Sequence, residues 1–223
     1  MTEPGEGSPP HESSPGKIVV PGIGRVTVEP DVASLRLGVT IVRPTAGEAR
    51  EAAAATMTAV VDAIVAASVA RRDLRTALVA LNPVTDYSGE RGPRVTGYQV
   101  SNTVAVTVRD LAATGAVIDR GLSAGATSLD GLEFHLDDPS AAEEAARTAA
   151  VDDARRRAST LAAAAGVALG GVEGVVEGGR GPVPLPMEGG IRGLGLKAAA
   201  ADTPVESGTQ ELEVSILVTF AIA

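Results

Sequence analysis

Three long stretches of the chain alternate apolar and polar residues with a period of two, over 33–42, 98–109 and 211–222. This pattern is typical of β-strands that bury one face and expose the other. In the first stretch Leu35, Leu37 and Val39 share one side, while Arg36 and Thr40 lie on the other. The apolar faces of such strands must be covered by another layer, so the fold needs helices or a second sheet.

Helical patterns lie between the strands. Thr45 and Glu48 fit a capping box at the start of a helix that runs to about residue 69. Asp110 is a good N-cap for a second helix, and Gly166 is placed to end a third helix that starts near residue 140. The buried face expected for this third helix consists of Ala142, Ala146, Ala154, Ala158, Leu161 and Ala165.

The resulting order of elements is ββα-ββα-βα-ββ. Strand pairs followed by helices favour an α+β fold, with an antiparallel sheet and helices packed on one face. The turn at 29–31 separates strands at 18–28 and 33–42, and we expect these two strands to form a hairpin. Because the chain has only two Tyr and two Phe, its core must be filled by aliphatic side chains and closely packed alanine.

Two segments lack the sequence pattern of a packed domain. Residues 1–16 are rich in Pro, Gly, Ser and Glu, which predicts a disordered tail ahead of one domain at 17–223. The segment 178–208 is dense in Gly and Pro and predicts a flexible loop, either a disordered excursion or an arm that orders against another subunit. The second alternative rests on a candidate interaction patch: Leu185, Met187, Ile191, Leu194 and Leu196.

Charge and composition narrow the classes of function. A net charge of −9 without a long basic run argues against nucleic-acid binding. The chain has no cysteine, and no apolar run is long enough to span a membrane. The N-terminus does not resemble a secretory signal, so the chain as given is expected in the cytoplasm. If an export signal has been removed, the expectation becomes the cell envelope or periplasm.

No catalytic, cofactor or metal site stands out. His11 and His135 are distant in sequence and have no cysteine beside them, so they make a poor zinc set. The acidic residues at 137–138 and 143–144 are explained by the favourable dipole at a helix start. The glycine-rich run at 189–197 lacks the Gly-Lys-Ser/Thr ending of a phosphate-binding loop. We therefore expect a protein that is not an enzyme.

Asn102 is the one polar residue on the apolar face of its predicted strand. A buried amide needs hydrogen-bond partners, so we expect Asn102 to be buried and hydrogen-bonded. Its partner is either another protein group, which makes it a structural residue, or a bound ligand.

Six short motifs follow one another along the chain: GIG at 22–24, GYQVSN at 97–102, VTVRDL at 106–111, GLEF at 131–134, AAVDDA at 149–154 and PVESG at 204–208. Their order and spacing resemble the SIMPL-domain family, which includes periplasmic immunogenic and YggE-type oxidative-stress proteins. The resemblance implies an α+β fold and, in some members, ring-like or channel-like oligomers. It implies no established catalytic residues.

Two hypotheses of function follow. The first is a non-enzymatic oligomeric scaffold or protein-interaction module, linked by the resemblance to cell-envelope or oxidative-stress physiology. Its partner is another copy of the chain or an unidentified protein. The second is a small-ligand-binding module with a pocket between sheet and helices near Asn102.

Overall fold

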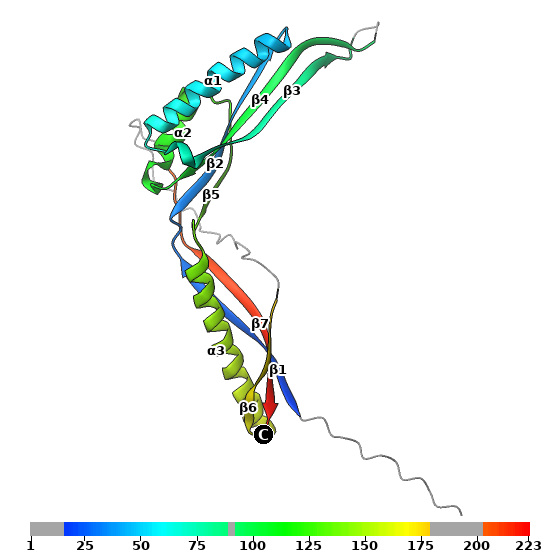
Figure 1. Ribbon diagram of the computed structural model, residues 1–223, viewed down its shortest axis with the longest axis vertical. Helices are drawn as coiled ribbons and strands as arrows, with labels where there is room; N and C mark the ends of the chain where they lie inside the picture. Colours follow the sequence, from blue (N-terminus) through cyan, green and yellow to red (C-terminus); the bar gives the residue numbers. More distant parts are fainter. Residues whose placement is uncertain (1–15, 89–91, 179–202) are drawn as a thin grey trace, which may run out of the picture. The chain divides into compact units, whose positions relative to one another are not determined.

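The strands of the protein divide between two sheets (Figure 1). The computed structural model describes residues 16–88, 92–178 and 203–223. One sheet has the strand order β1-β7-β6 and the other has the order β3-β4-β2-β5. Each sheet belongs to its own compact unit with its own apolar core. The predicted α+β class with antiparallel strands is confirmed, and helices and strands follow one another in the predicted order.

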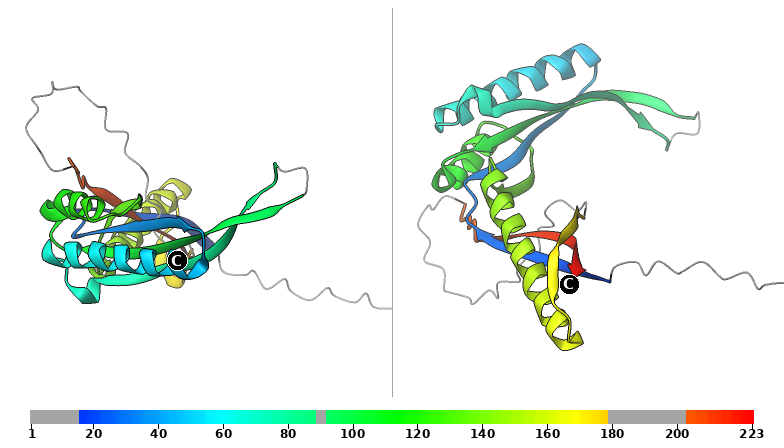
Figure 2. Two further views of the ribbon diagram at one scale, coloured as in Figure 1. Left: turned by 90° about the horizontal axis from the view of Figure 1, so that it is seen from above. Right: turned by 60° about the horizontal axis from the view of Figure 1, so that its bottom comes forward.

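The first unit combines both ends of the described chain. It contains β1 (Lys17–Val28), α3 (Ser140–Ala165), β6 (Leu169–Glu177) and β7 (Gln210–Ile222). The strand β7 lies in the middle of the sheet and turns its apolar side toward α3, which crosses the sheet (Figure 2). The side chains of β7 buried in this core are Leu212, Val214, Ile216, Val218 and Phe220.

Alanine and glycine allow α3 to lie directly on β1. The helix buries an alanine at every fourth position from Ala146 to Ala162, so its inner surface is nearly flat. A Cβ atom added at Gly22 would lie 2.1 Å from the carbonyl oxygen of Ala150, and one at Gly24 would lie 1.8 Å from that of Ala146. Both distances are far below van der Waals contact, so only glycine fits at these two strand positions.

The second unit contains the four-stranded sheet and two α-helices. Its elements are β2 (Val32–Arg43), α1 (Ala46–Ala66), the 3-10 turn η1 (Arg71–Asp73), β3 (Leu74–Asp86), β4 (Arg94–Val108), the 3-10 turn η2 (Leu111–Ala113), α2 (Thr114–Ser123) and β5 (Ser128–His135). Both helices contribute to one core on one face of the sheet. The strands supply to it alternate residues such as Leu35, Leu37, Val104 and Val106, and the helices supply Met57, Val60, Ile64, Val117 and Ile118.

The helix ends agree with most of the predicted signals. The Thr45 side chain accepts a hydrogen bond of 3.3 Å from the Glu48 backbone amide, as an N-cap does. Gly166 ends α3 in the left-handed conformation with φ of 70°. Asp110 caps the short turn η2 through the amide of Ala112, and α2 begins only at Thr114. The predicted cap is therefore present but one turn ahead of the helix.

The predicted hairpin of the first two strands is wrong. β1 pairs with β7, whereas β2 lies between β4 and β5. The turn at 29–31 carries the chain from the first unit to the second. After this turn the Asp31 amide donates to the carbonyl of His135, which ties the start of β2 to β5. Alternation identified both strands, but it does not specify which strand pairs with which.

The predicted buried face of the third helix is partly wrong. Ala146, Ala154 and Ala158 are buried as expected, but Leu161 is 50% exposed and Ala165 is exposed. The buried face also includes Ala150 and Ala162, so that the buried alanines follow one another at intervals of four residues. Because α3 lies so close to Gly22 and Gly24 of β1, only small side chains fit between the helix and the sheet. The larger Leu161 therefore points away.

Several expectations fall outside what the structure describes. Residues 1–15 and 179–202 are not described, and this range includes most of the predicted tail and loop and all five residues of the candidate patch at 185–196. The grouping of residues 17–223 as one domain stays a prediction. No helix in the described part of the chain is long and apolar enough to cross a membrane.

Candidate functional site

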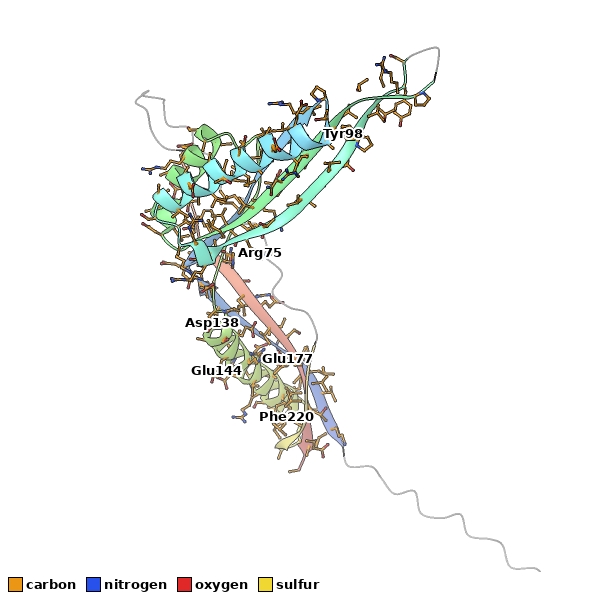
Figure 3. The ribbon with its side chains drawn as sticks, turned by 45° about the horizontal axis from the view of Figure 1, so that its top comes forward. Arg75, Tyr98, Asp138, Glu144, Glu177 and Phe220 are labelled. Atoms are coloured by element: carbon orange, nitrogen blue, oxygen red, sulfur yellow. The ribbon has the colours of Figure 1, made fainter. Side chains whose placement is uncertain are left out.

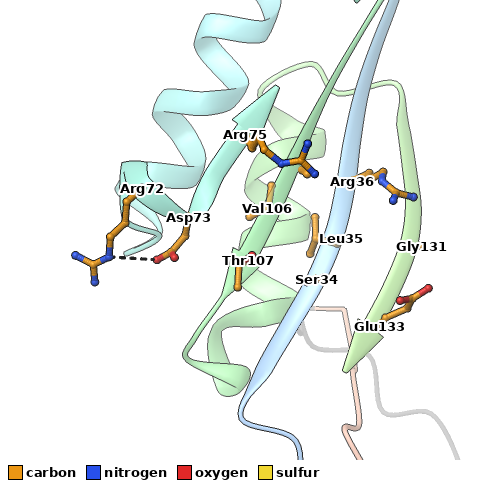
Figure 4. A pocket seen from close by; sticks show the side chains of 11 residues that line it. Ser34, Leu35, Arg36, Arg72, Asp73, Arg75, Val106, Thr107, Gly131 and Glu133 are labelled. Atoms are coloured by element: carbon orange, nitrogen blue, oxygen red, sulfur yellow. Dashed lines mark ion pairs between the residues drawn. The ribbon is translucent and has the colours of Figure 1, made fainter. Parts of the chain in front are cut away.

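The face of the four-stranded sheet opposite α1 and α2 carries a cavity of about 310 Å³ (Figure 4). Since Leu35 and Leu37 of β2 point into the helix-covered core, their neighbours Ser34 and Arg36 must point to the other face. The polar and small residues that line the cavity are Ser34, Arg36, Arg72, Asp73, Arg75, Ala105, Thr107, Gly131 and Glu133. The cavity lies entirely within the second unit.

Strand register brings the two arginines into one row. Arg36 on β2 and Arg75 on β3 are both direct partners of Ala105 on the strand β4 between them. The next row of the same face contains Ser34 opposite Thr107. Arg75 lies at the beginning of β3, away from Tyr98 farther along β4 (Figure 3). The cavity thus holds the guanidinium groups of Arg36 and Arg75 and the hydroxyl groups of Ser34 and Thr107 around the methyl group of Ala105. Arg72, Asp73 and Glu133 also line it.

An ion-pair network borders this cavity. The Asp73 side chain is only 8% exposed and accepts hydrogen bonds of 3.1 Å and 3.0 Å from Arg109 Nε and Nη2. Arg109 also reaches Asp137 at 2.7 Å, and the Asp137 amide donates to Asp31. Hydrogen bonds to Asp73 and then Asp137 raise the pKa of Arg109 above its ordinary value. This network joins η1 to the segment after β5, which is a structural role.

A second cavity of about 290 Å³ lies beside the same network, between the end of α1 and the end of β4. Its lining includes Ser68, Val69, Asp73, Arg109 and Asp110. Because Asp73 and Arg109 already bind each other, the charged groups of this cavity are largely satisfied. It offers less to a polar ligand than the cavity on the open face of the sheet.

The burial and hydrogen bonding of Asn102 differ from the expectation. It lies in the middle of β4, in register with Val39 of β2 and Val79 of β3, and it is half-buried rather than buried. No side-chain hydrogen bond of Asn102 occurs among the described residues, so the expectation of a buried, hydrogen-bonded amide is wrong. Neither cavity is lined by Asn102. A ligand contact at this residue stays a prediction.

The end of the predicted loop 178–208 is anchored to the second unit. The Thr203 amide and hydroxyl donate to the carboxylate of Asp119 on α2, at 2.9 Å and 2.6 Å. These hydrogen bonds lower the pKa of Asp119 below its ordinary value. Val205 packs against the core of the unit. Residues 203–205 therefore pack on the second unit.

The two arginines of the cavity were not singled out by the sequence. Arg36 was visible only as one residue on the polar face of its strand, and Arg75 carried no signal. Their proximity depends on β3 and β2 flanking β4, which alternation does not reveal. Within the described residues, no three His, Asp or Glu side chains form a group able to hold a metal ion.

Comparisons with known proteins assign the chain to a family. Residues 18–220 match the SIMPL family, described as "Protein of unknown function (DUF541)". The 26 kDa periplasmic immunogenic proteins of Brucella melitensis and Brucella abortus are each 37% identical over 215 residues, which cover 94% of this chain and 86% of theirs. The protein YggE of Escherichia coli strain K12 is 26% identical over 130 residues, covering 58% of this chain and 52% of its own. The chain belongs to the SIMPL family.

Proposed function

We propose that this protein is a non-catalytic module that assembles with copies of itself, and that the edge strand β3 forms the contact. The observation that carries the proposal is a group of exposed apolar side chains on both faces of this strand, with Val79 and Leu81 on one face and Leu78 on the other. Leu78 is 51% exposed, Val79 is 66% exposed and Leu81 is 45% exposed. Large apolar residues grouped in this way on one strand are characteristic of an interaction surface.

The backbone of β3 supports the same conclusion. β3 is last in its sheet and pairs only with β4, so one side of the strand has no strand partner among the described residues. An edge of this kind is a template for pairing with another strand. Beyond the start of α1, β3 and β4 continue as a two-stranded arm (Figure 1). The free stretch lies between a bulge after Thr76 and Pro83, a residue that edge strands tolerate.

A second copy of the chain is the partner that fits this edge best. An identical edge strand offers the same apolar residues and the same unpaired backbone groups, so pairing satisfies both copies at once. The oligomers expected from the family resemblance agree with this choice. Neither the family description nor the names of the relatives gives a reaction, which is why the module is proposed as non-catalytic.

The test is the mass of the protein in solution, measured by size-exclusion chromatography with light scattering over a wide range of concentration. We expect a multiple of the 22.3 kDa chain for the wild type. The double variant Val79→Lys, Leu81→Lys should fall to the monomer, because charge opposes burial of the edge. As a control, Val42→Lys with Leu217→Lys changes two apolar residues that are 47% and 45% exposed on β2 and β7, which are inner strands of their sheets. A monomeric wild type, or equal dissociation of both variants, would refute the proposal.

The compartment proposed for this assembly is the periplasm. The Brucella relative is named a periplasmic protein, which favours the envelope alternative over the cytoplasmic expectation. The link to oxidative stress stays an expectation from the resemblance. Osmotic shock of the source cells, followed by immunoblotting, tests the location. The protein should appear with the shock fluid, and its retention with cytoplasmic marker enzymes would contradict the proposal.

A further inference from the structure

We propose that Arg36 and Arg75 form a binding site for a small molecule carrying a phosphate or carboxylate group. The site is the cavity on the open face of the four-stranded sheet (Figure 4). Its volume of about 310 Å³ lies at the lower end of the range of small-molecule pockets. This function is independent of the self-assembly proposed above, which uses the edge of β3 rather than the face of the sheet.

The positions of the two arginines suit a shared ligand. Both pair in register with Ala105, so their Cα atoms are separated by two strand spacings, roughly 10 Å. The Arg75 side chain reaches over β4 toward Arg36 (Figure 4). The residue between them carries only a methyl group, which leaves the space above Ala105 open. The Arg36 side chain points toward Gly131 (Figure 4), so a ligand that contacts both guanidinium groups has to extend from the space above Ala105 across β2.

Neither arginine is neutralised by a carboxylate of the described chain. Arg72 has Asp73 at 4.0 Å and Arg109 has Asp73 and Asp137, but Arg36 and Arg75 form no ion pair or side-chain hydrogen bond within the described residues. Both side chains are exposed, so their guanidinium groups are accessible to a ligand from solvent. An anion placed between the two guanidinium groups is attracted by both of them.

Acidic neighbours are close enough to have paired with Arg36 but do not. Asp130 on β5 is in register with Arg36, and Glu133 lines the same cavity. The Arg36 guanidinium instead lies over Gly131, where an added Cβ would be 3.6 Å from its Nη1 atom. With no side chain at Gly131 to cover it, this guanidinium stays open to a ligand.

The chemistry of the lining selects an oxyanion. Guanidinium groups donate paired, parallel hydrogen bonds to phosphate and carboxylate oxygens, and these charge-assisted bonds are among the strongest in proteins. The hydroxyl groups of Ser34 and Thr107 line the same cavity and can donate further hydrogen bonds. Phosphate and carboxylate groups share this geometry, so the experiment must distinguish them.

Equilibrium dialysis of the full chain with radiolabelled inorganic phosphate, and separately with radiolabelled succinate, tests the site at constant ionic strength. We expect saturable binding of one molecule per chain for at least one probe. Saturation by phosphate alone identifies a phosphate-bearing ligand, and saturation by succinate alone identifies a carboxylic acid. Saturation by both supports a general oxyanion site.

The variant Arg36→Gln, Arg75→Gln should weaken the affinity at least tenfold. The matched control is Arg43→Gln with Arg94→Gln, which removes the same charge from exposed positions of β2 and β4 outside the cavity. The control should bind as the wild type does. Circular dichroism establishes that both variants are folded. Binding of neither probe, binding that does not saturate, or equal loss in both variants would overturn the proposal.

Discussion

Asp153 makes three contacts at the surface of α3 and connects this helix to β1. Its Oδ2 atom accepts a hydrogen bond of 3.1 Å from the Ile23 amide, and its carboxylate pairs with Arg156 at 3.0 Å and Arg157 at 2.8 Å. The hydrogen bond from Ile23 is the largest of the effects that lower the pKa of Asp153, and the two arginines act in the same direction. The ionised carboxylate is thus favoured in the folded state.

The lowered pKa makes stability depend on pH in a defined direction. Because the folded pKa lies below the ordinary value of 3.8, Asp153 stabilises the fold above that pH. This contribution is lost as the pH falls through the lowered pKa. The variant Asp153→Asn should unfold at lower urea concentration at neutral pH, and its stability should decline less steeply on acidification than that of the wild type.

The control for this prediction is the neighbouring exposed residue Asp152, changed to Asn. Urea unfolding followed by circular dichroism at neutral pH and below pH 3.8 compares the three proteins. Asp152→Asn should follow the wild-type curve. Parallel pH dependence of wild type and Asp153→Asn would show that the contact with Ile23 does not need the charge.

At the scale of helices and strands, the contact between α3 and β1 tolerates the least change, because the backbones of the two elements lie against each other. A side chain at Gly24 would place its Cβ 1.8 Å from the Ala146 carbonyl oxygen, so α3 would have to move away from the sheet. We expect Gly24→Ala to lower the free energy of unfolding by about 3 kcal/mol or more, at the upper end of the cost of overpacking. Chemical denaturation with far-UV circular dichroism measures this loss.

Gly174 provides the matched control on another strand of the same sheet. An added Cβ there meets no atom within 4 Å, so Gly174→Ala should be neutral or slightly stabilising, because glycine disfavours strands. If Gly24→Ala were as stable as Gly174→Ala, the close approach of α3 to β1 would be incorrect.

The sequence was sufficient to predict which segments are helices and strands, but not how the strands pair. Alternation in 33–42 and 98–109 correctly gave the inner face of two neighbouring strands, since the period of two depends only on local geometry. Gly22 and Gly24 of the first strand were quoted only as part of the GIG motif, and their structural reason is the close contact with α3, a helix that is distant in sequence. The false hairpin of this strand with 33–42 has the same origin, because its real partner β7 lies at the other end of the chain.

The candidate site was less predictable still, since it depends on the order of strands in the second sheet. Asn102 was chosen because it breaks an apolar pattern, but its strand face is only partly covered at that point. Arg36 and Arg75 occupy strand positions where polar residues are ordinary. Their proximity is evident only from the pairing of β2 and β3 with β4 on either side of Ala105. An unpaired charge can be recognised only after its neighbours are known.

For the whole molecule, the central claim is that copies of the chain associate through β3. Each of the two units has its own core, so the exposed apolar side chains of β3 are not needed for the packing of the second unit. In the isolated chain, the amides of β3 that point away from β4 should exchange their hydrogens rapidly. Association would protect these amides by giving them acceptors on another copy.

Hydrogen–deuterium exchange measured at several protein concentrations tests this claim most directly. The account predicts that the peptide covering Leu78–Leu81 becomes protected as concentration rises. The peptide from the core of β2, which includes Leu35 and Leu37, should exchange slowly at every concentration. Exchange in β3 that stays equally fast across the whole range, while light scattering shows an oligomer, would place the contact elsewhere and contradict the account.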